Sequence, residues 1–286
     1  MRSDARDYTL TAPGSLEAVL TALAANPKLT PIAGGTELMV ALGVGRLAAR
    51  ELVSLGGLQE LRFTRETADT LTLGAGTTFT DIRKSEIIAN EFPLLAQTAS
   101  WTGSIANQNR GTLGGNIANA SPAADNPPAL LAYDAQIELI STQGKRTLFY
   151  DGFHLGYKKT LLQPGELIYA IHLPRRFFAH RQYVRKVGTR NAQAISKIAL
   201  AATVLIESAT VKEIRLAGAS LADRPARLHA TEAALLHQPI NADTRTAAAA
   251  ALASEIKPID DIRSTAKYRI AVACNLLDEF LLSLVS

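Results

Sequence analysis

The chain contains very little sulfur, and this shortage excludes several kinds of site. One cysteine, Cys274, and two methionines occur among 286 residues. A single cysteine cannot form an internal disulfide, and it cannot supply the four thiolates of an all-cysteine iron–sulfur cluster. Because Cys274 lies in an apolar helical pattern, AVACNLLDEFLLSL, we expect a buried core thiol rather than a reactive one.

Long apolar runs and blocks of one charge are also missing. No apolar run approaches the roughly 18 residues that span a bilayer, and the first segment, MRSDARDYTLTAP, lacks the apolar stretch of a secretion signal. The formal net charge of +4 is dispersed along the chain, so binding to nucleic acid is not expected. These absences predict a cytoplasmic protein that uses neither a membrane nor nucleic acid.

The motifs of several common enzyme classes are absent. The five histidines include no HExxH or other close metal-ligand spacing. The chain has neither a GxxxxGK[ST] phosphate loop nor a GxSxG nucleophile elbow. Residues 43–48 fit GxGxxA, but residues 37–42 before them read as a helix, whereas a dinucleotide fold needs a strand there. We therefore predict no metal site and no Rossmann-type site in this chain.

Three glycine-rich turns with threonine occur in the first half of the chain. Residues 30–39, TPIAGGTELM, read as a short strand, the pair Gly34-Gly35, and a helix capped by Thr36. Residues 71–81, LTLGAGTTFTD, repeat the pattern, and residues 110–125 read RGTLGGNIANASPAAD. Adjacent glycines admit a ligand close to the backbone, and successive N–H groups in such turns bind phosphate oxygens. One such turn is equally well a polar loop, but three indicate one large phosphate-bearing ligand.

Local patterns predict helices and strands along the chain, and the order of these elements changes near residue 176. Before it we expect a helix over 16–25, a helix capped by Thr80 and Asp81 that runs to Ile88, a helix over 94–106, a hairpin over 135–150 and a strand over 167–173. Pro174 ends that strand. After residue 176 we expect strands at 182–187, 198–207 and 211–219, followed by helices at 231–237, 241–253 and 264–284. The pattern predicts an α+β fold with domains at 1–175 and 176–286.

Four segments taken in order resemble one protein family. AGGTEL, GAGTTFTDI, NRGTLGGNIANASPAADNPPALLAYDA and YKKTLLQPGELI are similar to segments of the FAD-binding medium subunit of the xanthine dehydrogenase family of molybdenum hydroxylases. The flavoprotein subunit of carbon monoxide dehydrogenase belongs to the same group. The resemblance covers essentially the whole chain. It implies a two-lobed FAD-binding domain of the vanillyl-alcohol oxidase (PCMH) type, followed by a small α+β C-terminal domain.

The resemblance also implies where the FAD cofactor lies. The first and third turns should take the FAD diphosphate through backbone N–H groups, and Lys186, or Arg185 one position earlier, should lie beside the flavin. Flavin carries the chemistry in such proteins, so no catalytic side chain and no metal ligand is implied here. The residues implied to bind the cofactor are Ile32, Ala33, Gly34, Gly35, Thr36, Glu37, Leu38, Thr112, Leu113, Gly114, Gly115, Asn116, Asp125, Ile168 and Lys186.

The family divides its reaction between subunits. Substrate is hydroxylated at a molybdenum cofactor in a large subunit, and electrons pass through [2Fe-2S] clusters of a small subunit to FAD, then to NAD+, dioxygen or a quinone. The single cysteine agrees with clusters that lie in partner subunits. The segment YKKTLLQPGE slightly favours a xanthine dehydrogenase-like member. The alternatives are a stand-alone FAD oxidase or reductase of the same fold, and a subunit that has lost FAD.

Overall fold

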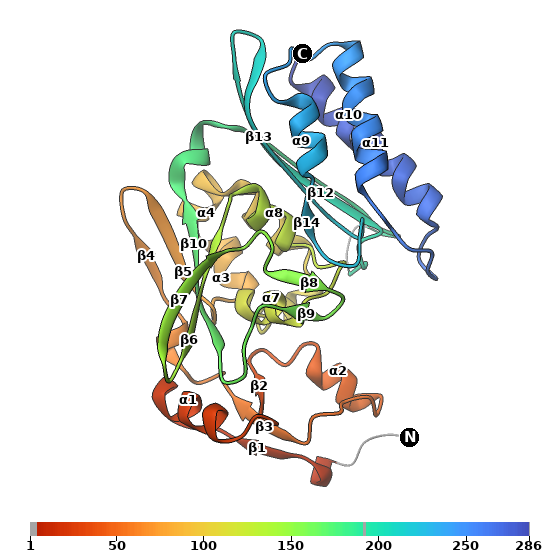
Figure 1. The fold of residues 1–286 in the computed structure, drawn as a ribbon. Helices are drawn as coiled ribbons and strands as arrows, with labels where there is room; N and C mark the ends of the chain where they lie inside the picture. The colour runs from red at the N-terminus through yellow and green to blue at the C-terminus, as the bar shows by residue number, and fades with distance from the viewer. Residues whose placement is uncertain (1–4, 191–192, 286) are drawn as a thin grey trace.

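The structure is a computed structural model and describes residues 5–190 and 193–285. Its strands form sheets of three, five, four and two strands. Figure 1 shows the three-stranded sheet at one end of the molecule, the five-stranded sheet in the middle and the four-stranded sheet at the other end. The chain forms these layers largely one after another, and each of the three larger sheets has helices packed beside it. This arrangement agrees with the α+β class expected from the sequence.

The N-terminal layer is a small parallel sheet with strand order β1-β3-β2. Its crossover helix α1 is capped by Ser15, whose hydroxyl accepts the N–H of Ala18, and α1 buries Val19 and Leu23 against the sheet and β10. The second crossover helix, α2, has no buried residue. The elements are β1 (Thr9–Thr11), α1 (Leu16–Ala25), β2 (Thr30–Ile32), α2 (Leu38–Gly43) and β3 (Glu51–Ser54).

The middle layer is an antiparallel sheet with strand order β4-β5-β10-β6-β7. The predicted hairpin is formed by β6 and β7, and Gly144, the first residue of β7, has φ +113°. Helices pack their apolar sides on this sheet and form the largest core cluster, which includes Leu73, Leu113 and Ile171. The elements are β4 (Thr64–Glu66), β5 (Thr70–Gly74), α3 (Phe79–Lys84), α4 (Glu86–Glu91), α5 (Pro93–Trp101), α6 (Ile105–Gln108), α7 (Leu113–Asn119), α8 (Pro127–Ala132), β6 (Gln136–Ser141), β7 (Gly144–Phe149) and β10 (Leu167–Pro174).

Two helices of this layer are shorter than their sequence patterns predict. Thr78, not Thr80, caps α3, and it forms a reciprocal capping box with Asp81. Ser85 ends α3 and caps α4, so the predicted helix to Ile88 is two helices. The predicted helix over 94–106 is likewise interrupted, because Gly103 has φ +63° between α5 and α6. A serine side chain can hydrogen-bond to nearby backbone groups in place of the helical hydrogen bonds. Glycine readily adopts the left-handed conformation that ends a helix.

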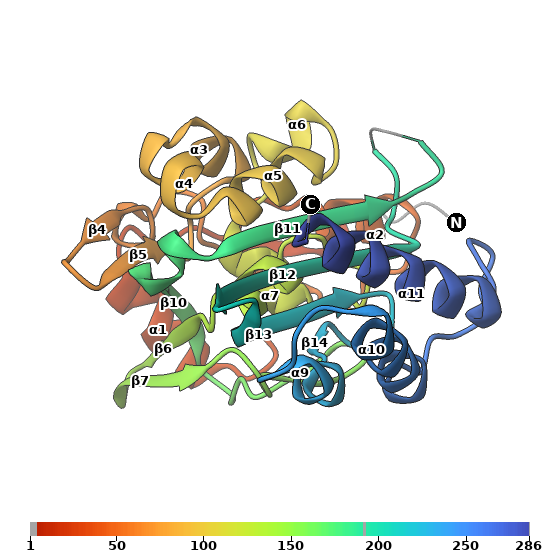
Figure 2. The same cartoon turned by 90° about the horizontal axis from the view of Figure 1, so that it is seen from above.

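The C-terminal layer is an antiparallel sheet with strand order β11-β12-β13-β14, whose strands lie side by side in Figure 2. Three helices cover one face, while α8 packs on the other, where Thr203 Oγ1 donates to Ala132 O at 2.9 Å. Cys274 is half-buried beside this core rather than fully buried. The elements are β11 (Arg181–Val187), β12 (Ile198–Glu207), β13 (Thr210–Ala219), β14 (Ala226–Arg227), α9 (His229–Leu235), α10 (Ala242–Glu255) and α11 (Ala266–Ser283), beside the small pair β8 (His154–Gly156) and β9 (Lys159–Thr160).

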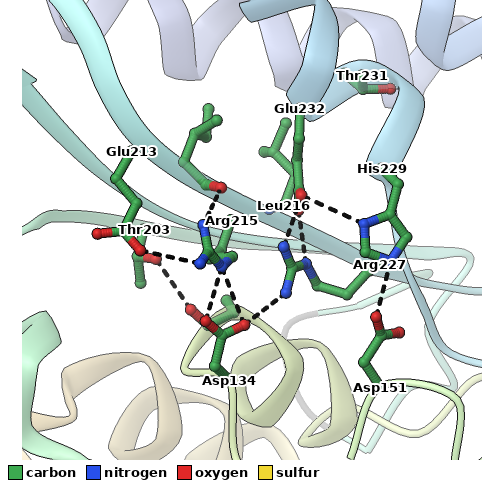
Figure 3. Close-up of polar contacts among 12 residues, drawn as sticks. Asp134, Asp151, Thr203, Glu213, Arg215, Leu216, Arg227, His229, Thr231 and Glu232 are labelled. Carbon is green, nitrogen blue, oxygen red and sulfur yellow. Dashed lines mark hydrogen bonds and ion pairs between the residues drawn. The ribbon is translucent and has the colours of Figure 1, made fainter. Parts of the chain in front are cut away.

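An ion-pair cluster around Asp134 joins the middle layer to the C-terminal layer (Figure 3). Asp134 Oδ1 lies 2.6 Å from Arg227 Nη1, and Asp134 Oδ2 lies 2.8 Å from Arg215 Nε. Arg176, in the segment between the layers, donates to the same carboxylate at 2.7 Å. Glu232 accepts two further hydrogen bonds from Arg227. One carboxylate from the middle layer is thus bound by three arginines.

Two negative findings apply to residues 5–190 and 193–285. No helix there combines the length and apolar character needed to cross a membrane. No group of three or more His, Cys, Asp or Glu side chains there is arranged to hold a metal ion.

Candidate functional site

The three glycine turns predicted to share one ligand lie against one another. Leu113 N–H donates to Thr77 O, and Gly114 N–H donates to Ala75 O, both at 2.9 Å. A Cβ atom added at Gly34 would lie 1.9 Å from the carbonyl oxygen of Arg110. Only glycine permits so close an approach of two backbones. The turns before α2 and before α3 therefore both contact the turn before α7.

The turn before α2 keeps its backbone donors free. Across the described parts of the chain, no acceptor lies within hydrogen-bond distance of the N–H groups of residues 34–37. Gly35 has φ +73°, a conformation that turns successive N–H groups toward one side and forms a concave anion site. We call these four donors the amide nest. The structure also corrects the predicted helix cap, because Glu37 rather than Thr36 precedes α2, and its side chain caps nothing.

The turn before α7 lacks the free amides that were expected there. Gly115 N–H donates to the hydroxyl of Thr112 at 3.1 Å, and Asn116 N–H donates to Thr112 O at 2.9 Å. With the bonds of Leu113 and Gly114 above, the amides of residues 113–116 are all paired inside the chain. Gly114 is needed for packing, because a Cβ there would lie 2.6 Å from Ala75 Cβ. This turn supports the amide nest instead of extending it.

One polar atom beside the nest has no partner within the chain. The side-chain oxygen Oδ1 of Asn116 is buried, and no donor among the described residues reaches it. The preceding Gly115 is exposed, and a Cβ atom there would lie 4.0 Å from Ala33 Cβ. Buried polar atoms are nearly always hydrogen-bonded in native proteins. An unpaired acceptor and unpaired donors therefore occur together at the meeting point of these turns.

Asp125 and Lys186, both predicted site residues, form a buried ion pair. Lys186 Nζ lies 2.7 Å from Asp125 Oδ2, and each side chain is 10% exposed. Ser196 donates its hydroxyl proton to the other oxygen of Asp125, and Lys186 also donates to Trp101 O at 3.4 Å. Burial raises the pKa of Asp125, while the charge of Lys186 and these hydrogen bonds oppose that rise. The pair joins strand β11 to the loop before α8.

Arg185 and Lys186, the two neighbouring candidates on β11, have different partners in the structure. Successive residues of a strand point to opposite faces. Arg185 is exposed, and its Nε lies 3.4 Å from Glu279 on α11. The structure therefore brings Lys186, and not Arg185, to Asp125.

Ile168, another predicted site residue, lies in the apolar core that also contains residues of α7. It is 6% exposed in β10 and belongs to the same buried cluster as Leu113 and Ile117 of α7. Ile32, in contrast, lies beside the nest, because a Cβ at Gly35 would be 3.5 Å from Ile32 Cδ1. In this structure Ile168 supports α7 from below.

The list of predicted cofactor-binding residues leaves out two polar residues of this region, Lys158 and Ser196. Lys158 Nζ lies 2.5 Å from Asn119 Oδ1 on α7 and 3.4 Å from Glu37 Oε1. Ser196 binds Asp125, as described above. The basic segment YKKT was a visible signal for Lys158, although it does not tell which of its lysines turns inward. Ser196 gave no signal, because it lies 71 residues from its partner.

Comparison with known protein families matches nearly the whole chain. Residues 6–176 match the model described as the FAD binding domain in molybdopterin dehydrogenase. Residues 183–284 match the model described as the CO dehydrogenase flavoprotein C-terminal domain.

Named relatives and solved structures agree with these models. The chain is 31% identical over 265 residues to the carbon monoxide dehydrogenase medium chain of Hydrogenophaga pseudoflava, covering 91% of this chain and 90% of that one. It is 30% identical over 258 residues to a putative xanthine dehydrogenase FAD-binding subunit of Escherichia coli, covering 90% and 88%. A solved carbon monoxide dehydrogenase from Hydrogenophaga pseudoflava has a chain that superposes with a TM-score of 0.91 at 29% identity, over 95% of each chain. The chain therefore belongs to the FAD-binding medium subunits of the xanthine dehydrogenase and carbon monoxide dehydrogenase family of molybdenum hydroxylases.

Proposed function

We propose that the amide nest binds the diphosphate of FAD. The observation that carries this proposal is the row of four consecutive backbone donors at residues 34–37 without acceptors in the described chain. Diphosphate oxygens are strong acceptors that match such a row. The unpaired Oδ1 of Asn116 supplies an acceptor for a hydroxyl of the same ligand. The residues present at the meeting turns thus fit the cofactor that the family binds.

The remaining site residues surround this anchor in the proposal. Ile32, Ala33 and Leu38 flank the nest, and Thr112, Leu113, Gly114 and Gly115 form its floor. Asp125 and Lys186 fix the C-terminal layer against the site, and Ile168 supports α7. The cation of Lys186 is 10% exposed, and charges in such sheltered places act strongly on a neighbouring ligand. This chain's residues bind, orient and shelter the cofactor, and none of them acts as an acid or base.

The proposed role in the complex follows from the cofactor. FAD held by these residues would supply the redox chemistry that connects the [2Fe-2S] clusters of a small partner subunit with NAD+ or another acceptor. A molybdenum-cofactor large subunit completes the assembly and oxidises the substrate. The single cysteine supports clusters in a partner rather than in this chain. A cytoplasmic location stays part of the proposal.

More specifically, we propose that the complex has xanthine dehydrogenase-like activity. It is supported by the segment YKKTLLQPGE and by the relative from Escherichia coli. Other relatives are named for carbon monoxide and for glyceraldehyde, so one medium-subunit fold serves complexes with different substrates. The substrate is set in the large subunit in this proposal.

Competition between nucleotides tests the nest directly. FAD is titrated into the deflavinated complex, and its binding is followed by flavin fluorescence in the presence of ADP or adenosine. If the nest binds diphosphate, ADP displaces FAD at much lower concentration than adenosine does. Equal competition by ADP and adenosine would show that binding does not depend on the phosphates, and the proposal would be wrong.

A further inference from the structure

The amide nest carries a feature that opposes its proposed ligand. Glu37 contributes one of the four free amides, and its carboxylate extends from the same residue. The Glu37 side chain is 61% exposed, so its carboxylate lies in a largely solvated place at the rim of the nest. A negative charge within a few ångströms of a diphosphate repels it. An anion site that contains a glutamate therefore needs a compensating cation.

Lys158 is placed to compensate that charge. Its Nζ lies 3.4 Å from Glu37 Oε1 and 2.5 Å from Asn119 Oδ1. Asn119 lies one helical turn beyond Asn116 on α7, so Lys158 connects the nest to the helix that forms its floor. One amine thus contacts both sides of the site from a third segment, the turn between β8 and β9.

The backbone holds Lys158 in this position at a conformational cost. Lys158 has φ +55°, and its N–H donates at 3.3 Å to the carbonyl of Ala120, which has φ +48°. Left-handed conformations are unfavourable for residues other than glycine and persist where surrounding structure imposes them. Two such residues bonded to each other fix the turn against the end of α7. The amine is therefore presented to the nest by a defined backbone and not only by a flexible side chain.

We propose that Lys158 is a positioning residue of the FAD site that neutralises Glu37 and thereby makes the nest receptive to diphosphate. This inference rests on the proposed function, namely that the nest binds the FAD diphosphate. The pair itself contributes little to folding, because both side chains are more than a third exposed and such pairs are screened by water. Its effect should therefore appear in cofactor affinity and not in the stability of the cofactor-free protein.

A double-mutant cycle separates this role from a general structural one. The FAD dissociation constant of the deflavinated complex is measured at low ionic strength for wild type, Lys158→Ala, Glu37→Gln and the double variant. We expect Lys158→Ala to bind FAD about threefold to tenfold more weakly and Glu37→Gln to bind it more tightly than wild type. The double variant should bind within about twofold of wild type, because the uncompensated carboxylate is gone. Lys159→Ala, the neighbouring exposed lysine, is the matched control and should bind as wild type does.

Each outcome decides the inference. Recovery of affinity in the double variant, together with loss of the Lys158→Ala effect at high salt, supports it. Equal weakness of Lys158→Ala and the double variant would overturn it, because Lys158 would then act without Glu37. An unchanged dissociation constant in Lys158→Ala would overturn it as well. If wild type itself shows no preference for ADP over adenosine, the proposed diphosphate site fails first, so the two failures are distinguishable.

Discussion

Lys186 Nζ lies 2.7 Å from Asp125 Oδ2, and this contact joins two parts of the chain that are 61 residues apart. Asp125 precedes α8 in the middle layer, and Lys186 lies on β11 of the C-terminal layer. Both side chains are largely buried. Together with the Asp134 cluster, this pair fixes the C-terminal sheet on the middle layer at two separate places. The geometry of the site therefore depends on contacts between layers.

Replacing Lys186 with methionine should destabilise the protein strongly. The change leaves the buried carboxylate of Asp125 without its cation, and losses of about 3–5 kcal/mol are typical of such half-broken pairs. The double variant Lys186→Met/Asp125→Leu should lose less than Lys186→Met alone, because no unpaired charge remains. Urea unfolding of the deflavinated protein measures both. A double variant as unstable as the sum of its single changes would show that the pair is not coupled.

Replacing Gly34 with alanine should remove most FAD while leaving a folded protein. The new Cβ would overlap the carbonyl of Arg110, at 1.9 Å, so the turns before α2 and α7 must separate. Flavin absorbance per protein chain reports the loss. Gly14→Ala is the control, because a Cβ there meets no atom within 4 Å. Full flavin content in Gly34→Ala would contradict the assignment of the nest.

The Asp134 cluster predicts that the two layers separate when its carboxylate is removed. Asp134→Ala leaves Arg227, whose side chain is 8% exposed, and Arg215 without a shared partner. Because Arg227 keeps Glu232 and Arg215 keeps Glu213, we expect a loss of about 1.5–3 kcal/mol in unfolding free energy and faster proteolysis in the segment around Arg176. Glu207→Gln, which breaks an exposed pair with Lys212, should cost less than about 1 kcal/mol. Equal effects of the two changes would argue against a joining role for the cluster.

His154 should make the protein less stable in mild acid. Burial, and then the charge of Arg224, lower the pKa of His154 to about 4, whereas an unfolded histidine titrates near roughly 6.5. Between these values the unfolded chain binds the extra proton, so stability falls as the pH decreases from about 6.5 to about 4.

Thermal midpoints measured across that pH range test the role of His154. His154→Phe should flatten this dependence, whereas His237→Asn, at an exposed histidine, should leave it unchanged. An identical slope in wild type and His154→Phe would assign the acid sensitivity to another group.

Much of the fold follows from local sequence, and the exceptions have local causes. The strands and helices after residue 180 appear close to their predicted ranges, because their apolar periodicity is regular. The helices over 80–88 and 94–106 are broken, since Ser85 and Gly103 stop helices that apolar spacing alone extends. The sequence pattern predicts the cap of this helix at Thr80 and Asp81. Only the capping box with Asp81 selects Thr78.

The sequence identifies the segments that form the site, but it does not identify the hydrogen bonds between them. Glycine patterns located the turns, but they do not reveal which amides stay free. The amides of Leu113 and Gly114 are bonded to the carbonyls of residues 77 and 75, a contact that depends on how the turn after β5 meets α7. Likewise, nothing near Asp125 in sequence points to Ser196. Such contacts arise from the packing of distant layers and are absent from local patterns.

The most direct measurement is the flavin, iron and molybdenum content of the complex purified through a tag on this chain. An absorption spectrum gives the flavin, and elemental analysis gives the metals. The account predicts one FAD for each copy of this chain, together with iron and molybdenum from partner subunits. FAD without metals would indicate a stand-alone flavoenzyme. A complex that contains the metals but no FAD would contradict the central claim that this chain's amide nest binds the cofactor.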